Sequence, residues 1–324
     1  MRGDYRVVVR NNKVQIKLHI RRNLTILQGN SATGKTTLLD LIDAYDNLGA
    51  DSGVVVNCDV PCKVIGGKNW ERDLSFIRDS IVFVDEGNSF LKSYDFAVVA
   101  KHSGNYFVIV SREPLPQLPY SVDEIYGLKN TGRATAKYPQ YSRVYASTYR
   151  VYGEELYNGE VPDLVVVEDS NSGFDFFSAL CEKNSVPCES AHGKGNVYKA
   201  VRDAPVASVL VIADGAAFGP HMELVMSLRR LKKVQLFLPE SFEWLILSSG
   251  LFDDNQTKEM LERPSDFIES KEFFSWEQFF TKALIERTSD TYLAYRKDKL
   301  NQSYLQPREF ASIVERIPSV GLSL

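Results

Sequence analysis

A glycine-rich loop between a strand pattern and a helix pattern constrains this chain more than any other stretch. Residues 29–37 read Gly-Asn-Ser-Ala-Thr-Gly-Lys-Thr-Thr, which matches the phosphate-binding pattern G-x-x-x-x-G-K-T. Asn23–Gln28 before it alternates as a strand does, and Leu38, Leu41 and Ile42 after it recur at helical spacing. This order of strand, loop and helix points backbone N–H groups and the positive end of a helix at one anion.

The candidate nucleotide ligands follow from this motif. Lys35 is expected to contact the β- and γ-phosphates of ATP, and the Thr36 hydroxyl is expected to hold Mg²⁺. The residues expected to surround the phosphates are Gly29, Asn30, Ser31, Ala32, Thr33, Gly34, Lys35, Thr36 and Thr37.

A second motif further along the chain completes the expected nucleotide site. The apolar run Ser80–Val84 is followed by Asp85 and Glu86, which is the usual magnesium-binding partner of a P-loop. Asp85 is expected to hold Mg²⁺ through water, and Glu86 to orient the attacking water as a catalytic residue. The next apolar run, Asn105–Val110, leads to Arg112. Two interpretations of Arg112 stay open, a phosphate contact and a solvated loop side chain.

The first half resembles the nucleotide-binding domain of ABC-like ATPases. The resemblance rests on the P-loop, on the Asp85-Glu86 pair and on a hairpin pattern, Tyr5–Arg10 and Lys13–Ile20, ahead of the P-loop strand. It implies a minimal ABC-like α/β domain over residues 1–160. Asp85 follows Thr36 by only 49 residues, and the family's L-S-G-G-Q signature loop is missing. We therefore expect ATP to act as a switch rather than to be hydrolysed rapidly.

The second half, residues 161–324, carries another alternation of strand and helix patterns. Asp163–Val167 ends in Glu168, and Ser208–Ala213 ends in Asp214. Such alternation predicts a parallel sheet whose carboxyl ends gather ligands. Beyond Gly250 the pattern turns helical, with helices expected as far as Tyr304 and over residues 307–317.

The acidic residues of this half resemble those of a Toprim domain, the metal-dependent fold of topoisomerases, primases and OLD-family nucleases. Glu168 matches the glutamate after its first strand and Asp214 the first aspartate of its Asp-x-Asp motif. Glu243 lies in a Ser-Phe-Glu segment similar to a turn in Toprim-like proteins that accompany ABC-like ATPases in phage-defence genes. The resemblance implies that Glu168, Asp214 and Glu243 hold Mg²⁺ or Mn²⁺, with Glu168 and Asp214 catalytic. Ala216 stands at the second aspartate, so a cutting site and a dead scaffold both stay open.

Composition and charge are those of an ordinary globular protein. Hydrophobic residues make up 44 %, and 38 basic against 42 acidic residues leave a net charge of −4, without the basic footprint of a dedicated nucleic-acid binder. The 4 cysteines lack zinc spacing and are typical of reduced thiols in a cytoplasmic protein. No apolar run approaches ~20 residues, so no membrane span is expected.

Three hypotheses about function follow. The first is an ATP-binding switch that controls a Mg²⁺-dependent nuclease acting on DNA or RNA in phage defence, as a homo-oligomer or with a partner protein. The alternative is a nucleotide-dependent binding or scaffold protein with a degenerate Toprim domain. A small-molecule or nucleotide kinase ranks last, because no arginine-rich lid is present. The tyrosine-rich stretch 138–157 is interpreted as a packed connector or, alternatively, as a surface that stacks nucleic-acid bases.

Overall fold

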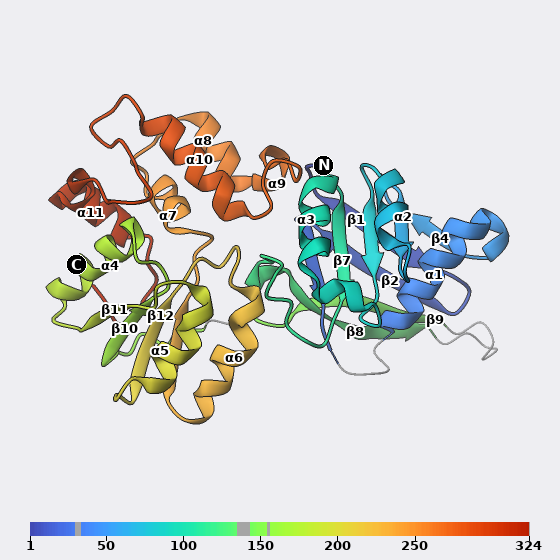
Figure 1. The fold of residues 1–324 in the computed structure, drawn as a ribbon, viewed down its shortest axis with the longest axis horizontal. Helices are drawn as coiled ribbons and strands as arrows, with labels where there is room; N and C mark the ends of the chain where they lie inside the picture. Colours follow the sequence, from blue (N-terminus) through green and yellow to red (C-terminus); the bar gives the residue numbers. More distant parts are fainter. Residues whose placement is uncertain (30–33, 135–142, 154–155, 324) are drawn as a thin grey trace. The chain divides into compact units, whose positions relative to one another are not determined.

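The computed structural model describes residues 1–29, 34–134, 143–153 and 156–323. The chain divides into two compact α/β units (Figure 1). The first comprises Met1–Gly153 with Pro264–Phe274, and the second comprises Glu154–Arg263 with Ser275–Leu324. Segment 264–274 therefore belongs to the first unit, although the sequence predicts it to be part of the second. The chain passes between the units at three places.

The first unit is built on a mostly parallel sheet with the order β4-β1-β2-β9-β8-β3-β7-β6-β5. The predicted hairpin is present, because β1 and β2 pair antiparallel with Val7 opposite Leu18. The described strands are β1 (Tyr5–Arg10), β2 (Val14–Ile20), β3 (Leu24–Leu27), β4 (Val55–Asn57), β5 (Cys62–Ile65), β6 (Ile81–Val84), β7 (Tyr106–Val110), β8 (Ile125–Ala134) and β9 (Arg143–Arg150).

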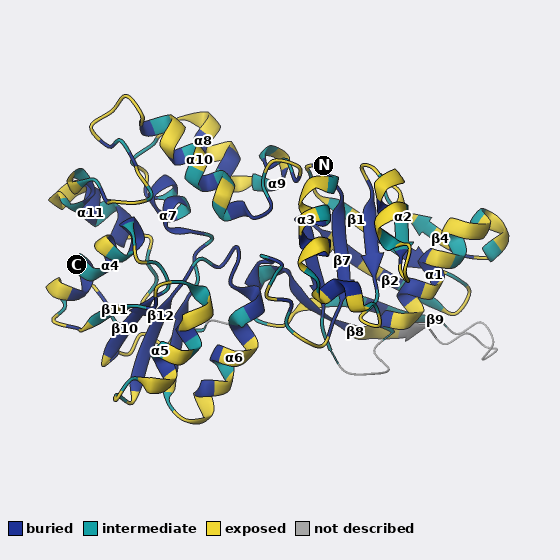
Figure 2. Cartoon of the chain, viewed as in Figure 1, coloured by how far each residue is buried: buried dark blue, intermediate teal, exposed yellow. Residues whose placement is uncertain are grey.

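Side-chain alternation along the central strands divides the first unit into two cores. On β6, Ile81 and Phe83 join the core around α1 (Lys35–Leu48), whereas Val82 and Val84 join the core on the opposite face. That opposite core also contains residues from α2 (Trp70–Phe76) and α3 (Tyr94–Ser103). Burial on both faces explains why the central strands are uniformly apolar and why Figure 2 shows them in dark blue.

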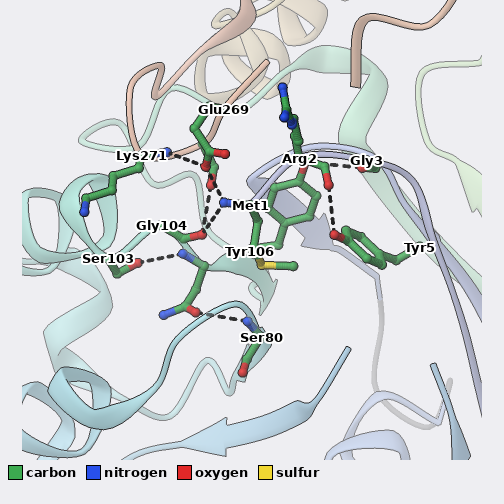
Figure 3. A network of polar contacts seen from close by, with 12 residues as sticks. Met1, Arg2, Gly3, Tyr5, Ser80, Ser103, Gly104, Tyr106, Glu269 and Lys271 are labelled. Carbon is green, nitrogen blue, oxygen red and sulfur yellow. Dashed lines mark hydrogen bonds and ion pairs between the residues drawn. The ribbon is translucent and has the colours of Figure 1, made fainter. Parts of the chain in front are cut away.

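Polar contacts join segment 264–274 to the rest of the first unit (Figure 3). The amino group of Met1 pairs with Glu269 and donates to the Gly104 carbonyl at 3.1 Å, and the Ser270 hydroxyl donates to the same carbonyl at 2.9 Å. At the end of the segment, Asn23 donates to the Phe274 carbonyl at 2.8 Å. The contacts of Glu269, Ser270 and Phe274 join parts of the chain that are more than 160 residues apart in sequence, which a sequence pattern does not reveal.

The second unit is built on a parallel sheet with the order β11-β10-β12-β13. Its strands are β10 (Leu164–Val167), β11 (Cys188–Ser190), β12 (Ser208–Ile212) and β13 (Lys233–Phe237). From β10 the chain continues to β11, which pairs with one edge of β10. It then crosses back to β12, which pairs with the other edge of β10. Because such crossovers are right-handed, α4 (Ser172–Lys183) and α5 (Val197–Asp203) lie on opposite faces. The order of the strands therefore reverses between β10 and β12.

Further helices complete the second unit and the segment 264–274. They are α6 (Met222–Ser227), α7 (Phe242–Ser248), α8 (Asn255–Glu262), α9 (Pro264–Phe267), α10 (Trp276–Thr288) and α11 (Pro307–Val314). The helices predicted beyond Gly250 are present as α8, α9, α10 and α11, but the prediction is wrong between Thr288 and Tyr304, because α10 ends at Thr288 and mostly turns follow it.

Candidate functional site

The glycine-rich loop has the expected strand before it and the expected helix after it. β3 is buried throughout, and α1 begins at Lys35 directly after Gly34. Gly29 and Gly34 have φ values of +135° and +95°, a region that a residue with a Cβ enters only at a cost. The predicted ligands Asn30, Ser31, Ala32 and Thr33 lie outside the described residues.

Lys35 is the best-defined member of this candidate nucleotide site. Its side chain is buried to 6 % exposure, and its Nζ donates to the Gly29 carbonyl at 2.7 Å, so the amine reaches back across the start of its own loop. Burial and the nearby Arg112 guanidinium lower the pKa of Lys35, and the Glu86 carboxylate partly offsets this. Electrostatic coupling to both groups indicates that the three side chains face one region.

Strand register explains why these residues meet. β7 lies between β3 and β6 and is parallel to both, with Val110 opposite Leu27 and Ile109 opposite Val84. The carboxyl ends of the three strands therefore reach one edge of the sheet at the same level. Arg112 follows β7 and Glu86 follows β6, and Arg112 Nε lies 3.1 Å from Glu86 Oε1.

The predicted Mg²⁺ ligands of the first unit are on the same edge. Asp85 is half-buried directly after β6, and its Oδ2 accepts a hydrogen bond from the Gly87 N–H at 3.4 Å. Thr36 and Thr37 are exposed in the first turn of α1. A hydroxyl and a carboxylate are oxygen donors suited to Mg²⁺. Their roles as ligands remain predictions.

The acidic residues of the second unit meet at the point where its strand order reverses. Glu168 follows β10 and Asp214 follows β12, and these strands are adjacent and parallel, with Val167 opposite Ile212. The Glu168 N–H donates to the Ile212 carbonyl at 2.8 Å. In open α/β sheets, ligands bind at such reversal points, outside the carboxyl ends of the strands.

The third predicted acid, Glu243, is brought to this place by α7. Ser241 caps the helix by accepting a hydrogen bond from the Trp244 N–H at 3.1 Å, and Glu243 in the first turn is buried to 2 % exposure. The Glu243 carboxylate accepts a hydrogen bond from the Tyr295 hydroxyl at 2.9 Å, and that hydroxyl also contacts Ser172 Oγ at 2.6 Å. Glu243 is thus held by buried partners.

Two further charged residues belong to this cluster and were missed by sequence reasoning. Lys297 is half-buried, and its Nζ lies 2.6 Å from Glu277 Oε1. Burial and then Glu277 raise the pKa of Asp214 well above its usual value, with Glu168 and Glu243 adding to the effect. Glu277 and Lys297 lie in the C-terminal part of the unit, where no local motif marks them.

The cavity enclosed by this cluster, here called the acidic pocket, is small. It has a volume of about 20 Å³ and is lined by Glu168, Asp214 and Glu243 together with Tyr295 and Lys297. This is room for about one water molecule. Carboxylates are the right donors for Mg²⁺, but no three His, Cys, Asp or Glu side chains in the described chain are arranged to hold a metal ion.

Ala216 lies beside this cluster but adds no charge to it. It is buried to 2 % exposure, and its N–H donates to the Glu240 carbonyl at 3.2 Å. The preceding Gly215 donates to the Pro239 carbonyl at 2.6 Å. Asp169 is the fourth carboxylate that lines the acidic pocket, and Glu277 is the charge that does most to raise the pKa of both Asp214 and Glu168.

No family model matches this sequence, and no curated protein or solved structure matches it. Across the described residues, no helix is both long enough and apolar enough to cross a membrane.

Proposed function

We propose that this protein is an ATP-binding switch joined to a Toprim-like site that processes nucleic acid. The observation that carries the nucleotide part is the convergence of Lys35, Glu86 and Arg112 at the carboxyl edge of three parallel strands. Lys35 beside the loop and Arg112 after β7 are cations that suit the phosphates of a triphosphate. Glu86 after β6 is a carboxylate that suits the attacking water.

The nucleic-acid part is supported by the position and chemistry of the acidic pocket. Glu168 and Asp214 follow adjacent strands at the reversal of strand order, where α/β proteins bind ligands. Because these three acids are not arranged around a metal ion in the described residues, Glu168, Asp214 and Glu243 would hold Mg²⁺ or Mn²⁺ only after their side chains shift. A divalent ion there would supply charge stabilisation for phosphodiester cleavage. The two sites occupy one chain that passes between the units three times, which favours coupling between them. Phage defence is the setting we propose.

The nucleotide part is tested by binding of a fluorescent ATP analogue in the presence of Mg²⁺. Lys35→Ala should abolish saturable binding, because it removes the buried amine beside Gly29. Lys63→Ala is the matched control, since Lys63 pairs with Asp46 at the surface of the same unit and should leave binding unchanged. Equal binding by wild type and Lys35→Ala would contradict the nucleotide part.

The nuclease part is tested with plasmid DNA and tRNA, with Mg²⁺ or Mn²⁺, in the presence and absence of ATP. Glu168→Ala should abolish cleavage, whereas Glu189→Ala on the neighbouring strand β11 should retain it. Lys35→Ala should remove the effect of ATP but leave ATP-independent cleavage. Absence of cleavage by wild type, or unchanged cleavage in Glu168→Ala, would exclude the nuclease.

A second candidate function is a nucleotide-dependent binding or scaffold protein. It is favoured by Lys297, whose ammonium group already compensates the negative charge of the acidic pocket, and by Ala216. Calorimetric titration with Mn²⁺ separates the two candidates. A site in wild type that disappears in Asp214→Ala supports the nuclease, and no binding supports the scaffold.

A further inference from the structure

A second cavity lies in the second unit, toward the end of its sheet that is opposite the acidic pocket. This cavity, here called the basic pocket, is lined by Arg229, Lys232 and the start of β13 together with the segment 156–160. Lys233 begins β13, whereas Asp214 follows the end of the parallel neighbour β12. The volume of the basic pocket is about 370 Å³, which is the size of a site for a small molecule.

The wall formed by segment 156–160 is fixed to β13, which lies at the edge of the sheet. The Leu236 N–H donates to the Leu156 carbonyl at 2.9 Å. The Gln235 side chain is buried, accepts a hydrogen bond from the Asn158 N–H at 3.0 Å and donates to the Glu160 carbonyl at 2.8 Å. These bonds hold the wall in place, so the basic pocket is formed before any ligand arrives.

Two cations of the basic pocket are held in position by backbone carbonyl groups. Arg229 Nε donates to the Val234 carbonyl at 2.9 Å, and its Nη2 donates to the Leu156 carbonyl at 2.8 Å. Lys232 Nζ donates to two carbonyls at the end of α5, one of which is that of Val201 at 3.0 Å. A side chain that is already ordered loses little conformational entropy when it binds a ligand. Both cations are therefore prepared to bind an anion.

The basic pocket carries more positive than negative charge. Lys233 Nζ lies 3.1 Å from Glu160 Oε2, so these two side chains neutralise each other. Among the residues that the structure describes, Arg229 and Lys232 donate to carbonyls and form no ion pair. A guanidinium group has five N–H donors and an ammonium group three, so both side chains keep donors for a ligand. The charge of both cations is thus left for a ligand to neutralise.

This charge favours a phosphate monoester over other common anions. A phosphate monoester carries a charge of about −1.5 to −2 at neutral pH, which matches two cations. A carboxylate or a phosphodiester carries only about one negative charge. The planar fork of a guanidinium group also fits two phosphate oxygens at once. We therefore expect the phosphate group to lie at Arg229 and Lys232.

The remaining lining indicates what the phosphate is attached to. Tyr157 contributes an aromatic side chain and Leu156 an aliphatic one, and Asn158 contributes an amide group. Nucleic-acid bases stack on aromatic rings, and an amide suits a sugar hydroxyl. We propose that the basic pocket binds a nucleoside monophosphate, with the phosphate at Arg229 and Lys232 and the base against Tyr157. This site shares no residue with the P-loop site or the acidic pocket, so it is independent of the function proposed above.

Calorimetric titration of the full-length protein tests the class of ligand. The Lys35→Ala protein is used, so that the P-loop site does not contribute. AMP, GMP, CMP and UMP are titrated separately, with inorganic phosphate and the matching nucleoside and cyclic nucleotide as comparisons. At least one monophosphate should bind saturably, and about 10-fold or more tightly than its cyclic diester, its nucleoside or inorganic phosphate. Binding of none of the four, or equal binding of a comparison compound, would overturn the proposal.

Hydrogen–deuterium exchange of the wild-type protein locates the site without any variant. The monophosphate that binds should slow exchange in the peptides that cover residues 156–160 and 228–237. Unchanged exchange in both peptides would overturn the proposal. Because this measurement and the comparison of ligands do not require a change in the basic pocket, misfolding of a pocket variant does not remove the test.

Matched variants in the Lys35→Ala protein identify the cations. Arg229→Ala and Lys232→Ala should each weaken binding of the monophosphate by about 10- to 100-fold, because each removes a charged hydrogen-bond donor. Arg230→Ala is the control, since Arg230 is the exposed neighbour of Arg229 in the short 3-10 helix Leu228–Arg230 and lies outside the lining of the pocket. Melting temperatures show whether each variant is folded. Unchanged affinity in folded Arg229→Ala and Lys232→Ala would overturn the assignment of these cations.

Discussion

Arg112 Nε lies 3.1 Å from Glu86 Oε1, which joins the residues that follow two neighbouring parallel strands. Glu86 is the residue proposed to orient water, and Arg112 is close enough to Lys35 to lower its pKa. The ion pair therefore lies where the terminal phosphate of a bound triphosphate would be expected. This relationship gives Arg112 a testable role.

Arg112→Ala should weaken ATP binding by about 10- to 100-fold and leave ADP binding almost unchanged, since a hydrogen bond to a charged group contributes about 1.5–3 kcal/mol. Competition against a fluorescent nucleotide measures both affinities. Arg150→Ala is the matched control, because Arg150 forms a similar half-exposed pair with Asp123 and should affect neither. Equal losses for ATP and ADP would show that Arg112 does not distinguish the terminal phosphate.

The buried carboxylate of Glu124 should be important for the stability of the first unit. It is fully buried and lies 3.1 Å from Arg21 Nη2 and 3.5 Å from Arg22 Nε. Glu124→Ala leaves two cations without the carboxylate they share, which should lower the free energy of unfolding by about 3–5 kcal/mol. Urea denaturation measures this.

The control for this experiment is Glu113→Ala. Glu113 pairs with Lys92 at the surface, where both side chains are more than half exposed. The change in the free energy of unfolding should stay within about 0.5 kcal/mol. If both variants lose the same stability, the buried network has no special contribution.

Asp214 should make the stability of the second unit depend on pH. Its pKa is raised in the folded protein by burial and then by Glu277, so folding favours the protonated carboxyl group. This contribution is complete below the unfolded pKa of about 3.9 and is lost as the pH rises through the higher folded pKa. Asp214→Asn should therefore raise the melting temperature at neutral pH and flatten its decline with pH.

Thermal melts of the variant between acidic and neutral pH check this expectation. Asp253→Asn is the control, since Asp253 forms an exposed pair with Lys258 and should leave the pH profile unchanged. The expectation would be contradicted if the melting temperature of the wild type rises steadily toward neutral pH and Asp214→Asn does not alter this dependence.

Gly215 should not tolerate a side chain. A Cβ at this position would lie 2.6 Å from the Leu238 carbonyl oxygen and 3.0 Å from that of Pro239. Gly215→Ala should lower the free energy of unfolding by about 1–3 kcal/mol, because the backbone must move. Gly195→Ala is the matched control, since a Cβ there meets nothing within 4 Å. Chemical denaturation of the two variants should separate them.

Several features were predictable because their signals are local. The strand before Gly29, the helix after it and the hairpin of β1 and β2 follow from periodicity over fewer than 20 residues. The placement of Asp85 and Glu168 at strand ends was predictable for the same reason. Other elements were missed where the signal is weak, such as β5, whose four residues are bounded by Pro61 and Gly66.

The sequence by itself determined the two α/β patterns, the phosphate-binding motif and the acids that end buried strands. Only the tertiary structure decided that β7 lies between β3 and β6, and that Glu277 and Lys297 join Asp214. The physical reason is the distance along the chain over which each kind of interaction acts. Periodicity and turn chemistry act between near neighbours, whereas strand order and the meeting of distant charges depend on which packing buries the most apolar surface over the whole unit.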